Sequence, residues 1–98
     1  MKNADVIEAF VKNGEPCKTA NLRYDGERLI NYNTTLAERD SANDRIFLNM
    51  TKYSRTTSTI QNRLQRELTG YVAYMGAGTV ISKMERVDIG TYSLKGLV

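Results

Sequence analysis

The chain has 98 residues, with no histidine, one cysteine, one proline and no tryptophan. This length corresponds to a single small domain over residues 1–98, with room for one modest core. Without histidine there is no imidazole base, and with one cysteine there is neither an intrachain disulfide nor a thiolate zinc site. We therefore expect no enzyme activity, no cofactor and no metal. No segment resembles a signal peptide or a membrane span, which favours a cytoplasmic protein.

The charge is distributed unevenly along the chain. The net charge is +3, of which residues 1–50 contribute −1 and residues 51–98 contribute +4. Between Thr51 and Arg66 there are four basic residues and no acidic one. Such a local positive field attracts phosphate or an acidic protein surface. A solvated helix face is the structural alternative.

A short helix is the first predicted element. Asn3 is its expected N-cap, Gly14 is expected to close it, and Pro16 breaks the chain after it. Its apolar face consists of residues at helical spacing: Val6, Ile7, Phe10 and Val11. A helix this short needs to dock against another element to persist.

From residue 20 to residue 50 the apolar period changes to two, which predicts antiparallel strands. The pair Asp25-Gly26 predicts a hairpin turn between strands at 22–24 and 28–32. Further strands are expected at 34–39 and 45–50, joined by a polar turn at 40–44. We expect two hairpins or a four-stranded meander. Alternatively, residues 28–39 form one long bent strand in place of two.

The spacing of Ile60, Leu64 and Leu68 predicts an amphipathic helix at about 58–69. Thr57 or Ser58 is the expected N-cap, and Gly70 is expected just past the end. Strands are then expected at 71–75, 79–84 and 87–89, with a turn at 76–78. The predicted fold class is α+β: an antiparallel sheet with a short N-terminal helix and this second helix.

The segment 51–59 stands out, because seven of its nine residues carry a hydroxyl group and the other two are basic. It precedes a predicted helix, whose N-terminus presents unpaired N–H groups and the positive end of a dipole. Arginine, lysine and hydroxyl groups there could hold phosphate, and Tyr53 could stack on a base. The alternative is that the hydroxyls cap the helix and Tyr53 packs into the core. The candidate binding residues are Lys52, Tyr53, Arg55, Asn62, Arg63 and Arg66.

Two other groups of residues carry weaker functional hypotheses. Glu38, Asp40 and Asp44 cluster around a predicted turn and could hold a divalent cation, although solvated acids are typical of turns. Cys17 beside Lys18 could be a reactive thiol, although a lone cysteine is more often a small packing residue.

Three blocks of the sequence form a pattern: Asn33-Thr34-Thr35-Leu36-Ala37, the run from Leu48 to Ser54, and Thr56-Thr57-Ser58 with Gln61. This pattern resembles a family of short proteins from phages and mobile elements, a domain of unknown function. It covers about the middle third of the chain. The resemblance implies no catalytic residues, because none are assigned in the family. It implies a small protein that acts by binding, as host-defence inhibitors such as anti-CRISPR proteins do.

We therefore expect a non-enzymatic phage or mobile-element protein that occludes a host protein or ribonucleoprotein, for instance a CRISPR effector. The chain is not acidic, so simple DNA mimicry is disfavoured. A direct nucleic-acid-binding module that uses residues 51–66 is the first alternative. A structural virion component or homo-oligomer is the second.

Overall fold

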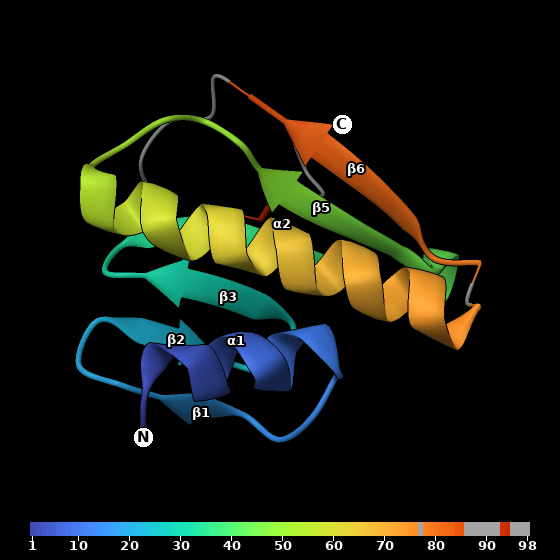
Figure 1. The fold of residues 1–98 in the computed structure, drawn as a ribbon, viewed down its shortest axis with the longest axis horizontal. Helices are drawn as coiled ribbons and strands as arrows, with labels where there is room; N and C mark the ends of the chain where they lie inside the picture. Colours follow the sequence, from blue (N-terminus) through green and yellow to red (C-terminus); the bar gives the residue numbers. More distant parts are fainter. Residues whose placement is uncertain (77, 86–92, 95–98) are drawn as a thin grey trace.

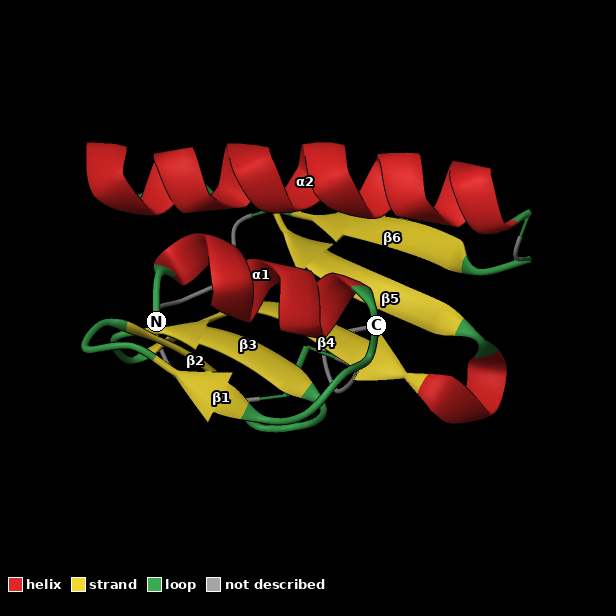
Figure 2. Ribbon diagram, turned by 60° about the horizontal axis from the view of Figure 1, so that its bottom comes forward, coloured by secondary structure: helices red, strands yellow, loops and turns green. Residues whose placement is uncertain are grey.

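The chain forms two layers, a β-sheet and a pair of helices that cover one face of it (Figures 1 and 2). The structure, a computed structural model, describes residues 1–76, 78–85 and 93–94. The elements in chain order are α1 (Asn3–Val11), β1 (Cys17–Lys18), β2 (Leu22–Tyr24), β3 (Arg28–Asn31), β4 (Thr34–Asp40), the 3₁₀ turn η1 (Ser41–Asn43), β5 (Arg45–Asn49), α2 (Arg55–Met75) and β6 (Val80–Met84). This is the predicted α+β class.

Within these described residues the sheet has six strands, which lie in the order β1-β2-β3-β4-β5-β6. Neighbouring strands from β1 to β5 are antiparallel, so the predicted meander is confirmed. The alternative of one long strand over 28–39 is wrong, because a tight turn at Tyr32-Asn33 separates β3 from β4. β6 pairs with β5 in parallel, after α2 has carried the chain back along the sheet.

The alternation predicted for the strand at 34–39 is interrupted by a β-bulge. Leu29 pairs with Ala37 and Ile30 pairs with Thr35, so Leu36 is an extra residue on β4. Leu36 and its neighbour Ala37 both belong to the core beneath the helices. A strict period of two would have placed them on opposite faces.

The ends of α1 differ in detail from the prediction. The helix begins at Asn3, and the Asp5 carboxylate accepts a hydrogen bond from the Lys2 backbone N–H (2.8 Å). The Asn3 side chain, predicted as the N-cap, accepts a bond from the Thr19 hydroxyl instead (2.6 Å). Asn13 rather than Gly14 adopts the left-handed conformation after the helix, with φ of 55°.

α2 is much longer than predicted, because both of its ends were misplaced. Ser54 is the N-cap, and its hydroxyl accepts the Thr57 N–H. The helix passes through Gly70 and ends at Gly76, which has the left-handed conformation that favours glycine. Tyr71 and Val72 pack partly against the core, so burial continues the helix past Gly70.

The predicted strand at 71–75 is therefore wrong, since these residues are helical. The strand predicted at 79–84 is confirmed as β6, although its partner is β5. The strand predicted at 87–89 lies outside the described residues. No helix in the described part of the chain is long and apolar enough to cross a membrane.

The core lies between the sheet and the two helices. Ile60, Leu64 and Leu68 form the buried stripe of α2, as their spacing predicts. The buried residues of α1 are also the predicted ones: Val6, Ile7, Phe10 and Val11. The Phe10 and Tyr24 rings meet edge to face, with 5.6 Å between their centroids. This core ties both helices to the same face of the sheet.

Substitution of Leu64 with alanine tests the packing of α2. Leu64 is only 1% exposed and lies in the middle of the buried stripe. Its loss would remove apolar contacts and leave a cavity, so we expect the free energy of unfolding to fall by about 2–5 kcal/mol. Urea denaturation would measure this change. A loss below about 0.5 kcal/mol, the range of ordinary surface substitutions, would contradict the packing described for α2.

Candidate functional site

The six candidate binding residues lie around the beginning and the outer side of α2. Lys52 and Tyr53 lie in the loop between β5 and α2, and the other four lie on α2. All are exposed except Tyr53, which is half-buried. Arg55, Asn62 and Arg66 recur at helical spacing on the side opposite the buried stripe. The structure therefore gathers most of the predicted site on one exposed helix face.

The hydroxyl-rich segment folds into a network of buried hydrogen bonds, as the structural alternative predicts. The Asn49 side-chain amide donates to the Thr35 carbonyl (3.1 Å) and to the Tyr53 hydroxyl (2.9 Å). Its side-chain oxygen accepts the Thr51 backbone N–H (3.0 Å). Tyr53 is thus part of the connection between sheet and loop, whereas base stacking would need an exposed ring.

Gln61 attaches the second turn of α2 to the same loop. Its amide nitrogen donates to the backbone carbonyls of Asn49 (2.7 Å) and Thr51 (2.9 Å). Gln61 is only 6% exposed, so these carbonyls have little access to water. Buried carbonyls that lack a hydrogen-bond donor are costly. The glutamine side chain therefore fixes where α2 begins relative to β5.

The N-cap of α2 is joined to β3 in a similar way. The Thr57 hydroxyl donates to the side-chain oxygen of Asn31 (2.7 Å) and accepts from the Ser54 hydroxyl (3.1 Å). Asn31 in turn donates to the Asn21 carbonyl (2.8 Å). The end of β3, the loop before β2 and the N-terminus of α2 are thereby connected. We call the residues Asn31, Asn49, Ser54, Thr57 and Gln61 the polar junction.

None of the five residues of the polar junction is among the predicted binding residues, although Tyr53, which contacts Asn49, is. Asn31, Asn49 and Gln61 are buried, although polar residues of this kind are mostly exposed. Helical spacing could have found Gln61, which lies three residues before Leu64. The block that resembles phage proteins contains Asn49, Ser54, Thr57 and Gln61. In this chain, the polar side chains of that block hold the fold together.

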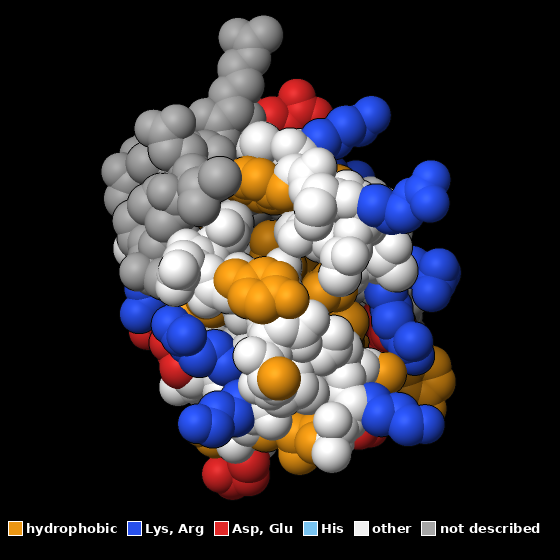
Figure 3. Space-filling model, turned by 90° about the vertical axis from the view of Figure 1, so that its left-hand side faces the viewer, with side chains coloured by type: hydrophobic (Ala, Val, Ile, Leu, Met, Phe, Trp, Pro, Cys, Tyr) orange, Lys and Arg blue, Asp and Glu red, His pale blue; other side chains and the backbone are white. Residues whose placement is uncertain are grey.

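Two of the exposed basic side chains, Arg55 and Arg63, line a hollow between the two helices. Its volume is about 380 Å³, and its lining includes Ala4 and Ile7 from α1 and Arg55, Ile60 and Arg63 from α2. Figure 3 views the end of the molecule at which α2 begins, where Lys and Arg side chains outnumber acidic ones. An aliphatic floor with arginines beside it suits a partner that combines an apolar group with negative charge.

The four arginine and lysine residues of the candidate site are not equivalent. Arg63 forms an ion pair with Glu67 (2.6 Å), the i,i+4 pair that the sequence predicts. Within residues 1–76, 78–85 and 93–94, Lys52, Arg55 and Arg66 form no ion pair. Arg66 lines a second hollow of about 440 Å³, with Tyr71 and Tyr74 near the end of α2. The positive charge of Arg55 and Arg66 is therefore left for a partner.

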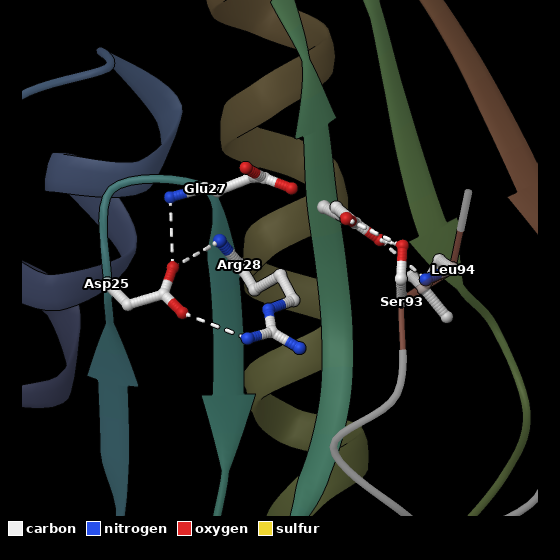
Figure 4. A network of polar contacts seen from close by, with 6 residues as sticks. Asp25, Glu27, Arg28, Ser93 and Leu94 are labelled. Atoms are coloured by element: carbon white, nitrogen blue, oxygen red, sulfur yellow. Dashed lines mark hydrogen bonds and ion pairs between the residues drawn. The ribbon is translucent and has the colours of Figure 1, made fainter. Parts of the chain in front are cut away.

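The hypothetical carboxylate site does not assemble. Glu38 is buried and accepts hydrogen bonds from the Ser93 hydroxyl (2.9 Å) and the Leu94 N–H (2.5 Å), as Figure 4 shows. Asp40 accepts from Asn43, and Asp44 accepts from Thr79. In the part of the chain that the structure describes, no three metal-ligating side chains converge. Glu38 instead attaches residues 93–94 to the face of the sheet opposite the helices.

Asp25 stabilises the turn between β2 and β3 (Figure 4). Its carboxylate accepts the N–H groups of Glu27 (2.9 Å) and Arg28 (2.7 Å), and the Arg28 guanidinium lies 3.5 Å away. Burial raises the pKa of Asp25, but the two N–H groups and the neighbouring guanidinium outweigh it and hold the pKa below its usual 3.8.

A carboxyl group with a lowered pKa stabilises the folded state at pH values above its unfolded pKa. Asp25→Asn should therefore lower the free energy of unfolding at pH 7, and the difference from the parent should shrink as the pH falls below about 3.8. Urea denaturation across this range would measure it. Glu15→Gln, at an exposed position, is the control and should show no such change. A difference for Asp25→Asn that does not vary with pH would contradict this account.

Gln61→Ala tests the polar junction. The change removes the donor for two carbonyl groups, so we expect a loss of about 1–3 kcal/mol in the free energy of unfolding. The neighbouring substitution Asn62→Ala, at an exposed position, is the matched control and should change it by less than about 0.5 kcal/mol. Equal effects from the two substitutions would show that the junction contributes little.

No protein-family model, no curated protein and no solved structure matches this chain. The resemblance of the 33–61 blocks to short phage proteins therefore stays a prediction. The strongest feature of the predicted site is the basic outer face of α2.

Proposed function

We propose that this chain is a small non-enzymatic binding protein and that the outer face of α2 is its contact surface. The observation that carries the proposal is the position of Arg55 and Arg66, which are exposed on one helix face and form no ion pair within the described residues. Lys52 adds a further positive charge just before the helix. The apolar hollow between the two helices opens beside Arg55, where it could hold an anchoring side chain of the partner.

The chemistry of this face defines the partner. Exposed arginines recognise carboxylate and phosphate groups, often through two parallel hydrogen bonds. The face is carried by a helix whose position the polar junction fixes, so little order has to be gained on binding. An acidic protein surface, or a ribonucleoprotein that exposes phosphate, would meet these requirements.

The resemblance to phage and mobile-element proteins suggests a biological setting. In that setting, the chain would inhibit a host defence system by occluding a protein or ribonucleoprotein, as anti-CRISPR proteins do. A net charge of +3 disfavours mimicry of DNA, which would need an acidic surface. Contact with bound RNA, or with acidic residues of the effector, fits the charge better.

A nucleic-acid-binding module is the second candidate, favoured by Lys52, Arg55 and Arg66, three cations that form no ion pair with any residue the structure describes. Binding through phosphates releases counterions, so the affinity would fall steeply as salt is raised. Short single- and double-stranded DNA and RNA at low salt would test it. A pull-down from host lysate with and without nuclease treatment separates the two candidates, because only a bridging nucleic acid is removed by nuclease.

The double substitution Arg55→Glu with Arg66→Glu should abolish partner binding and leave the fold intact. Both side chains are exposed, so stability should change little, whereas each reversal places a negative charge against an anionic partner. We expect an affinity loss of at least about tenfold for each residue, the cost typical of an interface hot spot. Isothermal titration calorimetry with the captured partner would measure the loss, and circular dichroism would check the fold.

Lys83→Glu is the matched charge reversal for this experiment, because Lys83 is an exposed cation on β6 rather than on α2. It should leave partner binding within about twofold of the parent, as expected for a charge outside the contact. If the α2 double variant binds as well as the Lys83→Glu variant, the contact surface lies elsewhere.

A further inference from the structure

A separate cavity lies on the side of the sheet that α1 and α2 do not cover. Its volume is about 420 Å³, within the range of small-ligand sites, and its lining includes Lys18, Asn21, Arg23, Ile30 and Tyr32. Arg23 alternates with Leu22 and Tyr24, which face the helices, so its side chain lies on the opposite face. None of these residues belongs to the proposed α2 surface.

Two cations line this cavity, and Asp25 interacts with one of them, Arg23, only from outside its lining. Lys18 and Arg23 face each other across β1 and β2, and Arg23 faces Ile30 across β2 and β3. Like charges directly opposite each other in a sheet repel. Among the described residues neither cation forms an ion pair, and no lining residue is acidic. The nearby Asp25 carboxylate is already bound to Arg28 and to backbone N–H groups. An anion between the two side chains would relieve their repulsion.

An exposed aromatic ring stands at the edge of the same cavity. Tyr32 is 63% exposed and has a φ of 53°, a conformation that a bulky residue rarely adopts. Strained conformations of this kind are concentrated at functional sites. A glycine or asparagine would fit the turn with less strain, so the presence of tyrosine needs a reason other than local folding.

The edge of the cavity is held in place by hydrogen bonds. The Tyr32 N–H donates to the Asn21 carbonyl (2.9 Å), which also accepts the Asn31 side-chain amide (2.8 Å). The Thr19 hydroxyl accepts the Leu22 N–H (3.1 Å) and fixes the turn between β1 and β2. The backbone that carries Tyr32 and Arg23 is therefore held in place before any ligand arrives, which lowers the cost of binding.

We propose that this cavity binds a nucleotide unit, with the base stacked on Tyr32 and the phosphate between Lys18 and Arg23. Base stacking on an aromatic ring with cations on the phosphate is the combination by which proteins bind single-stranded nucleic acid. Ile30 lines the cavity but is only 1% exposed, so the ring and the two cations make most of the contacts with the ligand. The unit could come from a free nucleotide or from a single strand, because both present the same base and phosphate. This proposal is independent of the partner proposed for α2.

Fluorescence anisotropy with a short labelled oligothymidylate at low salt tests the site. AMP and inorganic phosphate are then added as competitors. Tyr32→Asn removes the ring but suits the turn, since asparagine tolerates this backbone conformation. We expect it to weaken binding about tenfold while stability is kept or raised, and Tyr32→Phe to retain binding. Arg23→Glu should weaken binding at least as much as Tyr32→Asn, and more than the matched reversal Arg66→Glu.

Each outcome decides the question. Competition by AMP supports a free-nucleotide source, and binding of the oligonucleotide without AMP competition supports a single-stranded source. The proposal is overturned if neither probe binds, if phosphate competes as well as AMP, or if Tyr32→Asn binds as tightly as Tyr32→Phe. It is likewise overturned if Arg66→Glu reduces binding more than Arg23→Glu.

Discussion

The polar junction is the interaction on which the rest of this structure depends. In the described part of the chain the sheet consists of the meander β1–β5 and the parallel strand β6. α2 has to start at a defined point above this sheet, because the helix covers the core and then carries the chain to β6. Apolar packing is not directional and would allow α2 to slide along the sheet. The buried side chains of Asn31, Asn49 and Gln61 remove that freedom, since each of their hydrogen bonds is satisfied in one position only.

The sequence was most informative where the apolar period was regular. The meander, its turn at Asp25-Gly26 and the stripe of Leu64 follow from spacing and turn chemistry alone. The end of α2 was misplaced because Gly70 is a common stop signal, whereas the contacts of Tyr71 with the core are visible only in three dimensions. The parallel pairing of β6 could not be predicted either, since it depends on a helix long enough to return the chain.

For the candidate site, the positions of the charged residues were easier to predict from the sequence than the roles of the hydroxyl-bearing residues. The exposed cations on α2 lie where the sequence places them, because arginines opposite an apolar stripe have to face water. Tyr53 differs from these cations, since it is half-buried and bonded to Asn49, and a hydroxyl-rich segment looks the same in sequence whether it binds phosphate or caps a helix. Nothing in the sequence indicates that Tyr32 lines one cavity with Lys18 and Arg23, because strand register brings these residues together.

The parallel pairing of β5 with β6 has a consequence for how the chain assembles. Every other strand pair joins neighbours across a short turn, whereas Arg45 pairs with Val80, across a crossover that contains the whole of α2. Contacts between residues so distant along the chain form late, because the intervening segment has to lose its freedom first. β6 can therefore pair with β5 only after α2 has packed on the sheet and returned the chain to that edge. The last strand would then dock onto a framework that already exists.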